Sequence, residues 1–360
     1  CGETITAGEN DTVTAVLVSD VTELNTALGM EAITEIHLDP GTYTADSLTI
    51  ARNVSLIGAG SGSTVLEAHS NETMFICVTA GSSFSISGIH VKGDGNVTHN
   101  DHGGLLVGSD STAYTGTVSI TNCKFSGFTK NSITIKGGSA TISNNVIECN
   151  QFDGAAGNGI QIDRGATAVI TGNTIDAYVS NSEDWAATGV LVLRGGKTTN
   201  ISGNTIRHCQ IPICIGMTYD AAGDATSLSG YGSNTISNCT YGIFYQTSTA
   251  EQVVAAFNDN VAGSEVALYA SVTTDALTVP ANVTLSTYSG CNLTVNTTLT
   301  VNGTMAVSSD STLTVPADTA TTNIVGSTST SKLVVGSTEQ YWNPVTEQWD
   351  TSSLTGKVAA

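Results

Sequence analysis

The chain has 360 residues, of which 40% are hydrophobic and only 12% are charged, and its 31 acidic and 11 basic side chains give a net charge of −20. The apolar content is enough to build a sizeable core. The acidic balance disfavours a nucleic-acid partner or an anionic membrane surface. No stretch approaches the roughly 18 consecutive apolar residues that a transmembrane segment needs.

The N-terminal segment, residues 1–32, carries two local signals. It opens at Cys1-Gly2, which resembles what remains after lipoprotein signal processing, so a lipid anchor at Cys1 is one expectation and an arbitrary chain boundary is the other. The stretch D20-V-T-E-L-N-T-A-L predicts a short helix, with Asp20 as the N-cap and Glu23 closing a capping box. We expect this helix to cover the first end of the fold.

Internal repetition is the strongest signal in the sequence. One pattern of six consecutive positions recurs. In order, these hold an apolar residue, a small hydroxyl residue, Asn or Gly, Asn or Cys, any residue, and a second apolar residue. It begins at Ile120, Ile142, Ile170, Ile201 and Ile236, with an earlier variant at Ile86. The spacing of 22 to 35 residues between these starts fits one turn of a solenoid with loops of variable length.

A second short strand precedes each copy of the pattern, as in G104-L-L-V, S132-I-T-I and G159-I-Q-I. No helical period lies between the two strands, and the tight two-residue turns of antiparallel hairpins do not recur. The pattern therefore predicts parallel strands stacked coil on coil.

The fourth position of the pattern predicts a structural ladder where the chain turns sharply. Asparagine there tolerates left-handed backbone angles and can hydrogen-bond from coil to coil. The ladder residues are Cys123, Asn145, Asn173, Asn204 and Cys239. The cysteines are expected to be packed thiols, although Cys1, Cys77 and Cys291 could instead bridge chains in an oxidising setting.

At this point the sequence resembles the right-handed parallel β-helix repeat proteins of the pectate-lyase-like superfamily. The resemblance implies an all-β solenoid with a capping helix at its N-terminus and a cap at its C-terminus. It places the β-helix with long loops over residues 33–250. This fold carries lyases, hydrolases, epimerases and non-enzymatic surface proteins, so the resemblance specifies the fold more than the activity.

The spacing of the strands shortens after about residue 250. Val279, Leu285, Val295 and Val301 lie 6 to 10 residues apart, which predicts that residues 251–338 continue the helix with short coils. Residues 339–360 hold two of the three tryptophans and predict a C-terminal cap or tail. An aromatic platform for sugars is the alternative for these tryptophans.

When the strands that precede the pattern in successive coils are aligned, three basic residues fall at the same corner. They are Lys136, Arg164 and Arg194. As the resemblance implies, enzymes of this fold place their active groups on this face and in its flanking loops. A polysaccharide lyase would use Arg194, Arg164 or Lys136 as the catalytic base that removes the proton next to a uronate carboxylate. The alternative is that these cations simply pair with local acids.

Other residues near this corner complete a candidate site. Trp185, Tyr178 and Gln161 are the candidate substrate-binding residues, because aromatic faces stack on pyranose rings and amides bind hydroxyl groups. Ca²⁺ is the one cofactor that a lyase mechanism would add, and its candidate ligands are Asp163, Asp153 and Asp184.

A second polar cluster gathers His90, Asp94, His99, Asp101 and His102 within 13 positions. Side chains of this kind could ligate a transition metal, but no ordered metal-binding spacing is present. The sequence also lacks the Asp-Asp and Gly-His-Gly signatures of the polygalacturonase branch of this fold, the nucleophile elbow, the P-loop and the dinucleotide fingerprint.

Two functions are consistent with these features. The first is an extracellular cell-surface β-helix with a structural or adhesive role, without a complete catalytic site, that associates with itself end to end or laterally. The second is a carbohydrate-active module that acts on cell-surface polysaccharide, either as a Ca²⁺-dependent lyase or epimerase or as a sugar binder. The sequence favours a protein that is not an enzyme. Ten N-x-[S/T] sequons permit glycosylation.

Overall fold

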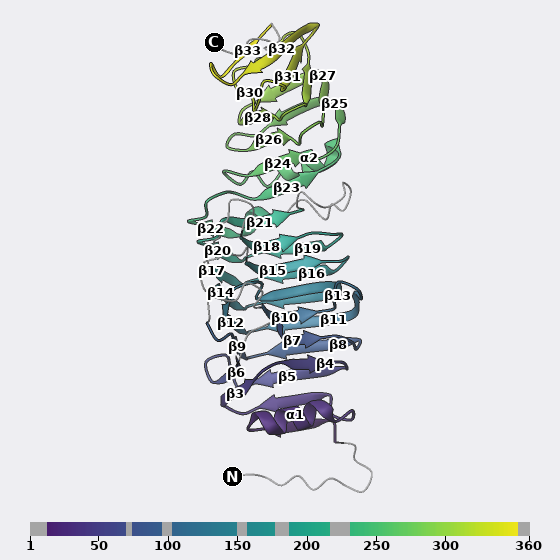
Figure 1. The fold of residues 1–360 in the computed structure, drawn as a ribbon, viewed down its shortest axis with the longest axis vertical. Helices are drawn as coiled ribbons and strands as arrows, with labels where there is room; N and C mark the ends of the chain where they lie inside the picture. The colour runs from purple at the N-terminus through teal and green to yellow at the C-terminus, as the bar shows by residue number, and fades with distance from the viewer. Residues whose placement is uncertain are drawn as a thin grey trace, which may run out of the picture. The chain divides into compact units, whose positions relative to one another are not determined.

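The computed structural model describes residues 13–69, 74–95, 103–149, 157–176, 187–216 and 231–351. The chain forms two compact units (Figure 1). Unit 1 comprises Cys1–Gln210 and Asn234–Asn238, and unit 2 comprises Ile211–Ser233 and Cys239–Ala360. The division therefore lies earlier in the chain than the change of strand spacing near residue 250.

Unit 1 is built from three parallel sheets. Sheet A contains β1 (Ala15–Val18), β2 (Glu35–Leu38), β5 (Val54–Gly58), β8 (Ser83–Ser87), β11 (Tyr114–Thr121), β13 (Ile133–Ser143), β16 (Thr167–Thr171) and β19 (Lys197–Ser202). Sheet B contains β3 (Gly41–Ala45), β6 (Thr64–Ala68), β9 (His90–Lys92), β12 (Lys124–Phe128), β14 (Val146–Cys149), β17 (Thr174–Asp176), β20 (Thr205–Arg207) and β22 (Thr235–Ser237). Sheet C contains β4 (Leu48–Ile50), β7 (Met74–Val78), β10 (Gly103–Val107), the first part of β13, β15 (Asn158–Asp163) and β18 (Thr188–Val192).

Within unit 2, the strands pair in two sheets. Sheet D is parallel and contains β21 (Ile211–Ile215), β23 (Phe244–Thr247), β24 (Glu265–Leu268), β26 (Thr284–Thr287), β28 (Thr304–Val307) and β30 (Ile324–Gly326). Sheet E begins with the parallel strands β25 (Val272–Val279), β27 (Leu293–Val301), β29 (Thr312–Val315) and β31 (Lys332–Val335). It ends with the antiparallel strands β32 (Thr338–Asn343) and β33 (Gln348–Asp350). The described part also has a short 3₁₀ turn at Tyr231–Ser233 and a helix, α2 (Ala250–Phe257).

These pairings confirm the predicted fold class, an all-β parallel β-helix. Except at Ile236, which lies on sheet B, the pattern residue that begins each repeat is an inward-facing residue of sheet A, paired with its equivalent on the next coil. This row consists of Ile36, Leu56, Ile86, Ile120, Ile142, Ile170 and Ile201. Each member is no more than 1% exposed, so each contributes about 1.5 to 3 kcal/mol of hydrophobic stabilisation.

The predicted N-terminal helix forms as α1 (Val21–Gly29), and it buries Leu24 and Ala27. The Asp20 side chain caps it by accepting hydrogen bonds from the backbone N–H groups of Thr22 and Glu23. Glu23 does not complete the predicted capping box with Asp20. Instead, its carboxylate accepts from the backbone N–H and hydroxyl of Ser19 at 2.7 and 2.9 Å. The N-cap satisfies donors that would otherwise lack partners at the start of the helix.

The C-terminal tail forms an antiparallel hairpin from β32 and β33 against the last coil of unit 2. Trp342 and Trp349 face each other edge to face, with ring centroids 5.2 Å apart. The indole N–H of Trp349 donates to the backbone oxygen of Ile324 at 2.8 Å. The tryptophans therefore hold the tail in place within unit 2. Helix α2, which begins at the capping box of Thr249 and Gln252, was not anticipated in the sequence.

A buried asparagine ladder joins the turns between sheets A and B. Each side-chain N–H₂ group donates to a backbone oxygen of the preceding coil and to the side-chain oxygen of the next asparagine, at 2.8 to 2.9 Å. The donors are Asn145, Asn173 and Asn204, and the acceptors are Ile120, Ile142 and Ile170 together with Asn173, Asn204 and Asn234. Cys123 begins the row, because its backbone N–H donates to Asn145.

Two details of the ladder differ from the sequence prediction. Cys239 is not a member, because Ile236 pairs with Ile206 and not with Ile201, and Asn234 occupies the next position of the row instead. The left-handed angles belong to the residues immediately before the ladder positions, including Asn122 and Asn144. Cys77 and Cys291, which could have bridged chains, are free thiols.

Replacing Asn173 with alanine should destabilise the protein by about 2 to 4 kcal/mol. The change leaves the buried backbone oxygen of Ile142 and the backbone N–H of Asn145 without these partners, and it removes one of the two hydrogen bonds that the Asn145 side-chain amide donates. Each buried group left without a partner costs about 1 to 3 kcal/mol. Urea unfolding followed by circular dichroism measures this change. The matched control is Asn200→Ala, at an exposed position of β19, which should shift stability by less than about 0.5 kcal/mol. Equal effects of the two substitutions would contradict a structural role for the ladder.

Candidate functional site

The three basic residues predicted to line one corner lie on successive coils of unit 1. Lys136 follows the sheet C part of β13 and is paired in register with Asp163 on β15. Arg164 and Arg194 follow β15 and β18, and both adopt left-handed backbone angles, with φ of 53° and 47°. Such angles are uncommon outside glycine. Here they produce the turn from sheet C to sheet A, and they place both guanidinium groups at the same corner.

Asp110 joins the three cations. Its Oδ1 atom lies 2.9 Å from Nζ of Lys136, 3.2 Å from Nη2 of Arg164 and 3.9 Å from Nη1 of Arg194. The hydrogen bond from Lys136, together with the charges of the two arginines, lowers the pKa of the Asp110 carboxyl. The Asp110 side chain is 66% exposed, whereas that of Lys136 is 11% exposed. We call these four residues the basic corner.

A second carboxylate, Asp163, holds Arg194 from the sheet side. Nε of Arg194 donates to Oδ1 of Asp163 at 2.8 Å, and Nη2 donates to Oδ2, so the pair is bidentate. Asp163 is fully buried. It also accepts from the backbone N–H of Arg164 at 2.7 Å and from Nε2 of Gln161 at 3.1 Å. A buried carboxylate with this many donors has its acceptor capacity filled.

A chain of buried amides leads to Asp163 across the outer face of sheet C. Thr188 donates to Asn158 at 2.8 Å, Asn158 donates to Asn131 at 3.0 Å, and Asn131 donates to Gln161 at 2.8 Å. Gln161 then donates to Asp163. Every amide uses its oxygen on one side and its nitrogen on the other. Since amides do not exchange protons readily, this network orients Asp163 and does not relay protons.

The structure brings together only part of the residues that the sequence put forward. Lys136, Arg164, Arg194, Gln161 and Asp163 lie in one contiguous site. Trp185, Tyr178, Asp153 and Asp184 lie outside the described residues.

The donors of Asp163 leave it little capacity for a Ca²⁺ ion. Within the described ranges, no group of three or more His, Cys, Asp or Glu side chains could hold a metal ion.

Sequence reasoning missed Asp110 and the amide chain, although a signal for both was present. Asp110 follows the strand G104-L-L-V and therefore falls at the same corner, one coil before Lys136. Asn131, Asn158 and Thr188 each lie two residues before the first inward-facing residue of a sheet C strand. Aligning the acids and amides in the same way as the cations would have found them.

The second polar cluster does not form a metal site in the part of the chain that the structure describes. His90 is half-buried on sheet B, and its Nε2 lies 2.8 Å from the Ser126 hydroxyl. Burial, together with the charges of Lys124 and Lys92, lowers the pKa of His90. His99, Asp101 and His102 lie outside the described residues.

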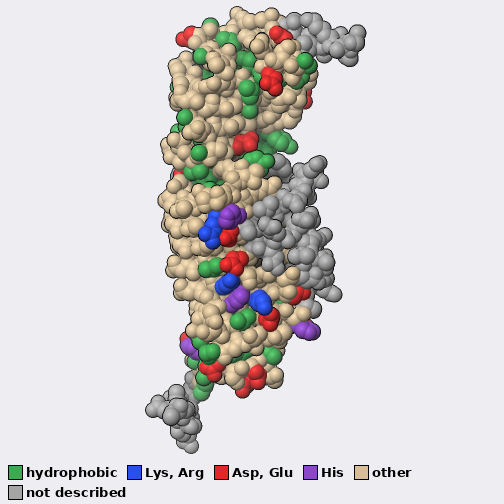
Figure 2. Space-filling view, turned by 90° about the vertical axis from the view of Figure 1, so that its left-hand side faces the viewer, with side chains coloured by type: hydrophobic (Ala, Val, Ile, Leu, Met, Phe, Trp, Pro, Cys, Tyr) green, Lys and Arg blue, Asp and Glu red, His purple; other side chains and the backbone are tan. Residues whose placement is uncertain are grey.

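Ion pairs join successive coils along sheet B. Lys92 contacts Glu67 at 2.6 Å, Lys124 contacts Glu148 at 2.8 Å, and Arg207 contacts Asp176 at 2.7 Å. Figure 2 shows charged and histidine side chains gathered on part of one face, with little charge around them. Exposed pairs of this kind contribute only about 0 to 1 kcal/mol each to the stability of the fold. They therefore matter more for the register in which the coils stack than for stability.

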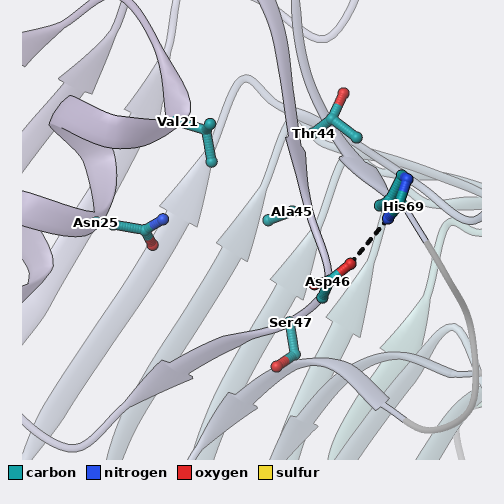
Figure 3. A pocket seen from close by; sticks show the side chains of 7 residues that line it. All are labelled: Val21, Asn25, Thr44, Ala45, Asp46, Ser47 and His69. Atoms are coloured by element: carbon teal, nitrogen blue, oxygen red, sulfur yellow. Dashed lines mark hydrogen bonds and ion pairs between the residues drawn. The ribbon is translucent and has the colours of Figure 1, made fainter.

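A shallow pocket beside α1 is lined by Val21, Asn25, Thr44, Ala45, Asp46, Ser47 and His69. In Figure 3, His69 and Asp46 face each other, with Nδ1 and Oδ1 2.9 Å apart. Both side chains are more than 70% exposed. Water competes for such a contact, so this pair is not positioned in the way that a catalytic dyad is.

Replacing Asp163 with asparagine should destabilise the protein by about 2 to 3 kcal/mol, because Arg194 and the backbone N–H of Arg164 lose a buried charged acceptor. Asp110→Asn is the matched control. Its side chain is exposed, so the same change should cost less than about 1 kcal/mol, and added salt should reduce the loss further. Thermal unfolding at low and high salt measures both. A loss for Asp110→Asn as large as that for Asp163→Asn would contradict the difference in burial.

None of the helices in the described residues is long and apolar enough to cross a membrane. Two solved structures are similar to the chain. One is the catalytic domain of a GH87 alpha-1,3-glucanase in complex with tetrasaccharides, with 13% identity, a TM-score of 0.38, and 89% of this chain and 69% of that chain covered. The other is a pectin methylesterase from carrot, with 14% identity, a TM-score of 0.31, and 91% of each chain covered.

No curated protein sequence matches the chain. The family model described as "Right handed beta helix region" matches residues 87–295. These residues are more than half of the chain, and the matched range holds the repeats, the asparagine ladder and most of the basic corner's strands. The chain therefore belongs to the right-handed beta helix family.

Proposed function

We propose that the protein is an extracellular, cell-surface β-helix with a structural or adhesive role, and that it does not cleave polysaccharide. One observation carries this proposal. The basic corner, where a lyase of this fold would be expected to act, is closed by the protein's own carboxylates, because Asp110 contacts all three cations and Asp163 holds Arg194 in a bidentate pair.

The pairing in the corner opposes proton abstraction by these cations. A lyase needs a base whose pKa is lowered, so that it is neutral when substrate binds. A carboxylate beside a cation has the opposite effect, because it stabilises the charged form. Arg194 lies against the buried Asp163 and Lys136 lies against Asp110. Both cations therefore already donate hydrogen bonds to the protein's own carboxylates.

The surface of unit 2 supports a structural or adhesive role. Along β25 and β27, exposed threonines alternate with buried leucines and valines, as Thr278 and Thr300 do around Leu277 and Leu299. A hydroxyl-rich surface with few charges suits a protein outside the cell. The role also includes self-association, end to end or lateral.

A second candidate function is a carbohydrate-active one, in which the corner binds an acidic polysaccharide. The observation that favours it is the convergence of Lys136, Arg164 and Arg194 on a single exposed carboxylate. The carboxylate of a uronate could take the place of Asp110 and receive the same hydrogen bonds. Gln161, which is 9% exposed, lies beside this corner.

The test incubates the purified protein with a panel of polyuronates and follows the unsaturated product of elimination. We expect no product from the wild-type protein or from Asp110→Asn. We also expect filaments, sheets or large particles in negative-stain electron microscopy and light scattering. A lyase activity that Arg194→Ala abolishes while the fold is retained would contradict the proposed function.

Asp110→Asn also separates the two candidate functions. If the corner is a binding site for uronates, removing the competing carboxylate should tighten polygalacturonate binding by about fivefold or more, in line with the loss of one charge contact. Unchanged, undetectable binding in both forms would contradict the carbohydrate-active candidate and leave the structural one.

A further inference from the structure

Two tyrosines stack on the outer face of sheet D in unit 2. The register pairs Leu268 with Thr287, so the next residues, Tyr269 and Tyr288, occupy the same position on successive coils. Their rings are nearly parallel, with centroids 4.4 Å apart and planes inclined by 16°. This separation follows from the distance of about 4.8 Å between neighbouring strands. Each ring therefore covers one face of the other.

The stack ends at Tyr288. The register between β26 and β28 pairs Ser286 with Ala306, so it brings Ser308 opposite Tyr288 on the following coil. Serine is too small to cover an aromatic ring. The side chain of Tyr288 is correspondingly 44% exposed. One face of its ring is thus packed on Tyr269, while the other is directed towards a coil with only a hydroxyl at that position.

Polar groups lie along the same outer face. Glu265, on β24, accepts a hydrogen bond from the Ser286 hydroxyl at 2.6 Å. Burial raises the pKa of Tyr269, and the neighbouring charges of Tyr288 and Glu265 raise it further. Ala267 lies between Glu265 and Tyr269 in the sequence and pairs with Ser286, and both of these small residues are buried.

We propose that Tyr288, backed by Tyr269, is a binding platform for a neutral sugar. The apolar face of a pyranose would stack on the open face of Tyr288 and continue the aromatic row. A rigid ring of this kind supplies contact area at little cost in conformational entropy. The ring is held by its partner before any ligand arrives, so little ordering is needed on binding.

The surrounding charges select a neutral ligand over a uronate. In the described part of unit 2, Lys332 is the only Lys or Arg, and it pairs with Glu339 at 2.6 Å. A ligand carboxylate would find only this paired cation in the described part of unit 2, on a chain with a net charge of −20. The platform thereby differs from the basic corner, whose three cations suit an acidic ligand. The proposed platform rests on the adhesive part of the proposed function, and it names the class of ligand that an adhesive role would involve.

The test measures the binding of soluble neutral hexasaccharides of glucose, with α-1,4, β-1,3 and β-1,4 linkages, by calorimetry and saturation-transfer NMR. We expect at least one to bind the wild-type protein, with aromatic signals of tyrosine in contact with the sugar. Tyr288→Ala should weaken that binding tenfold or more, whereas Tyr288→Phe should retain most of it. The matched control is Tyr241→Ala, because Tyr241 is also exposed, at 58%, but lies outside the stack.

A second variant keeps the test decisive if Tyr288→Ala fails to fold. Ser308→Leu leaves both tyrosines in place and covers the open face with a branched side chain that offers no flat ring, so it should abolish binding while the circular dichroism spectrum is retained. Hexagalacturonate serves as the anionic probe and should not bind at this site. The platform is overturned if no neutral hexasaccharide binds the wild-type protein, if Ser308→Leu and Tyr288→Ala bind normally, or if hexagalacturonate competes there.

These outcomes are separable from those of the proposed function. Elimination of polyuronates and formation of ordered assemblies are measured without a neutral glycan, and neither depends on Tyr288. Loss of the platform with assembly intact would overturn only this inference. Neutral-sugar binding by a protein that also cleaves polyuronates would overturn the proposed function and leave the platform in place.

Discussion

The constraint on which the rest of the structure depends is the short, fixed distance between parallel coils. Neighbouring strands lie about 4.8 Å apart, so each side chain meets the side chain at the same position of the next coil. Rows of identical or complementary residues satisfy this arrangement. The isoleucine row of sheet A fills the interior, and the asparagine ladder pairs the polar groups of the turns between sheets A and B.

The same constraint determines what the outer faces can do. At the corner after sheet C, it brings Asp110, Lys136, Arg164 and Arg194 within contact distance, although they are up to 84 positions apart in the sequence. In unit 2 it stacks two tyrosines and leaves the second exposed. In the first case opposite charges neutralise one another, and in the second an open ring face remains. This difference is why we assign binding chemistry to the tyrosines and a closed state to the corner.

Much of the fold could be predicted from the repeats, because a row of stacked residues leaves a regular trace in the sequence. The isoleucine spacing was predicted in this way, whereas the capping helix was predicted from its N-cap signal and the C-terminal tail from its tryptophans. The assignment of Cys239 to the ladder was wrong, because I236-S-N-C resembles the repeat but its isoleucine pairs with Ile206. Asp110 was overlooked because only the cations of this corner were aligned, although Asp110 follows the strand G104-L-L-V in the same way. The tyrosine stack depends on the register of two short coils, which the sequence alone does not specify.

Amide hydrogen exchange measured by mass spectrometry tests the central claim most directly. If stacked rows hold unit 1 together, peptides covering residues 139–149, 167–176 and 197–206, which contain the asparagine ladder, should exchange slowest, at rates close to global unfolding. The exposed turn at Val345, which is 90% exposed, should exchange fastest among the described residues and provides the internal reference. Exchange in the ladder peptides as fast as in that turn would contradict the account.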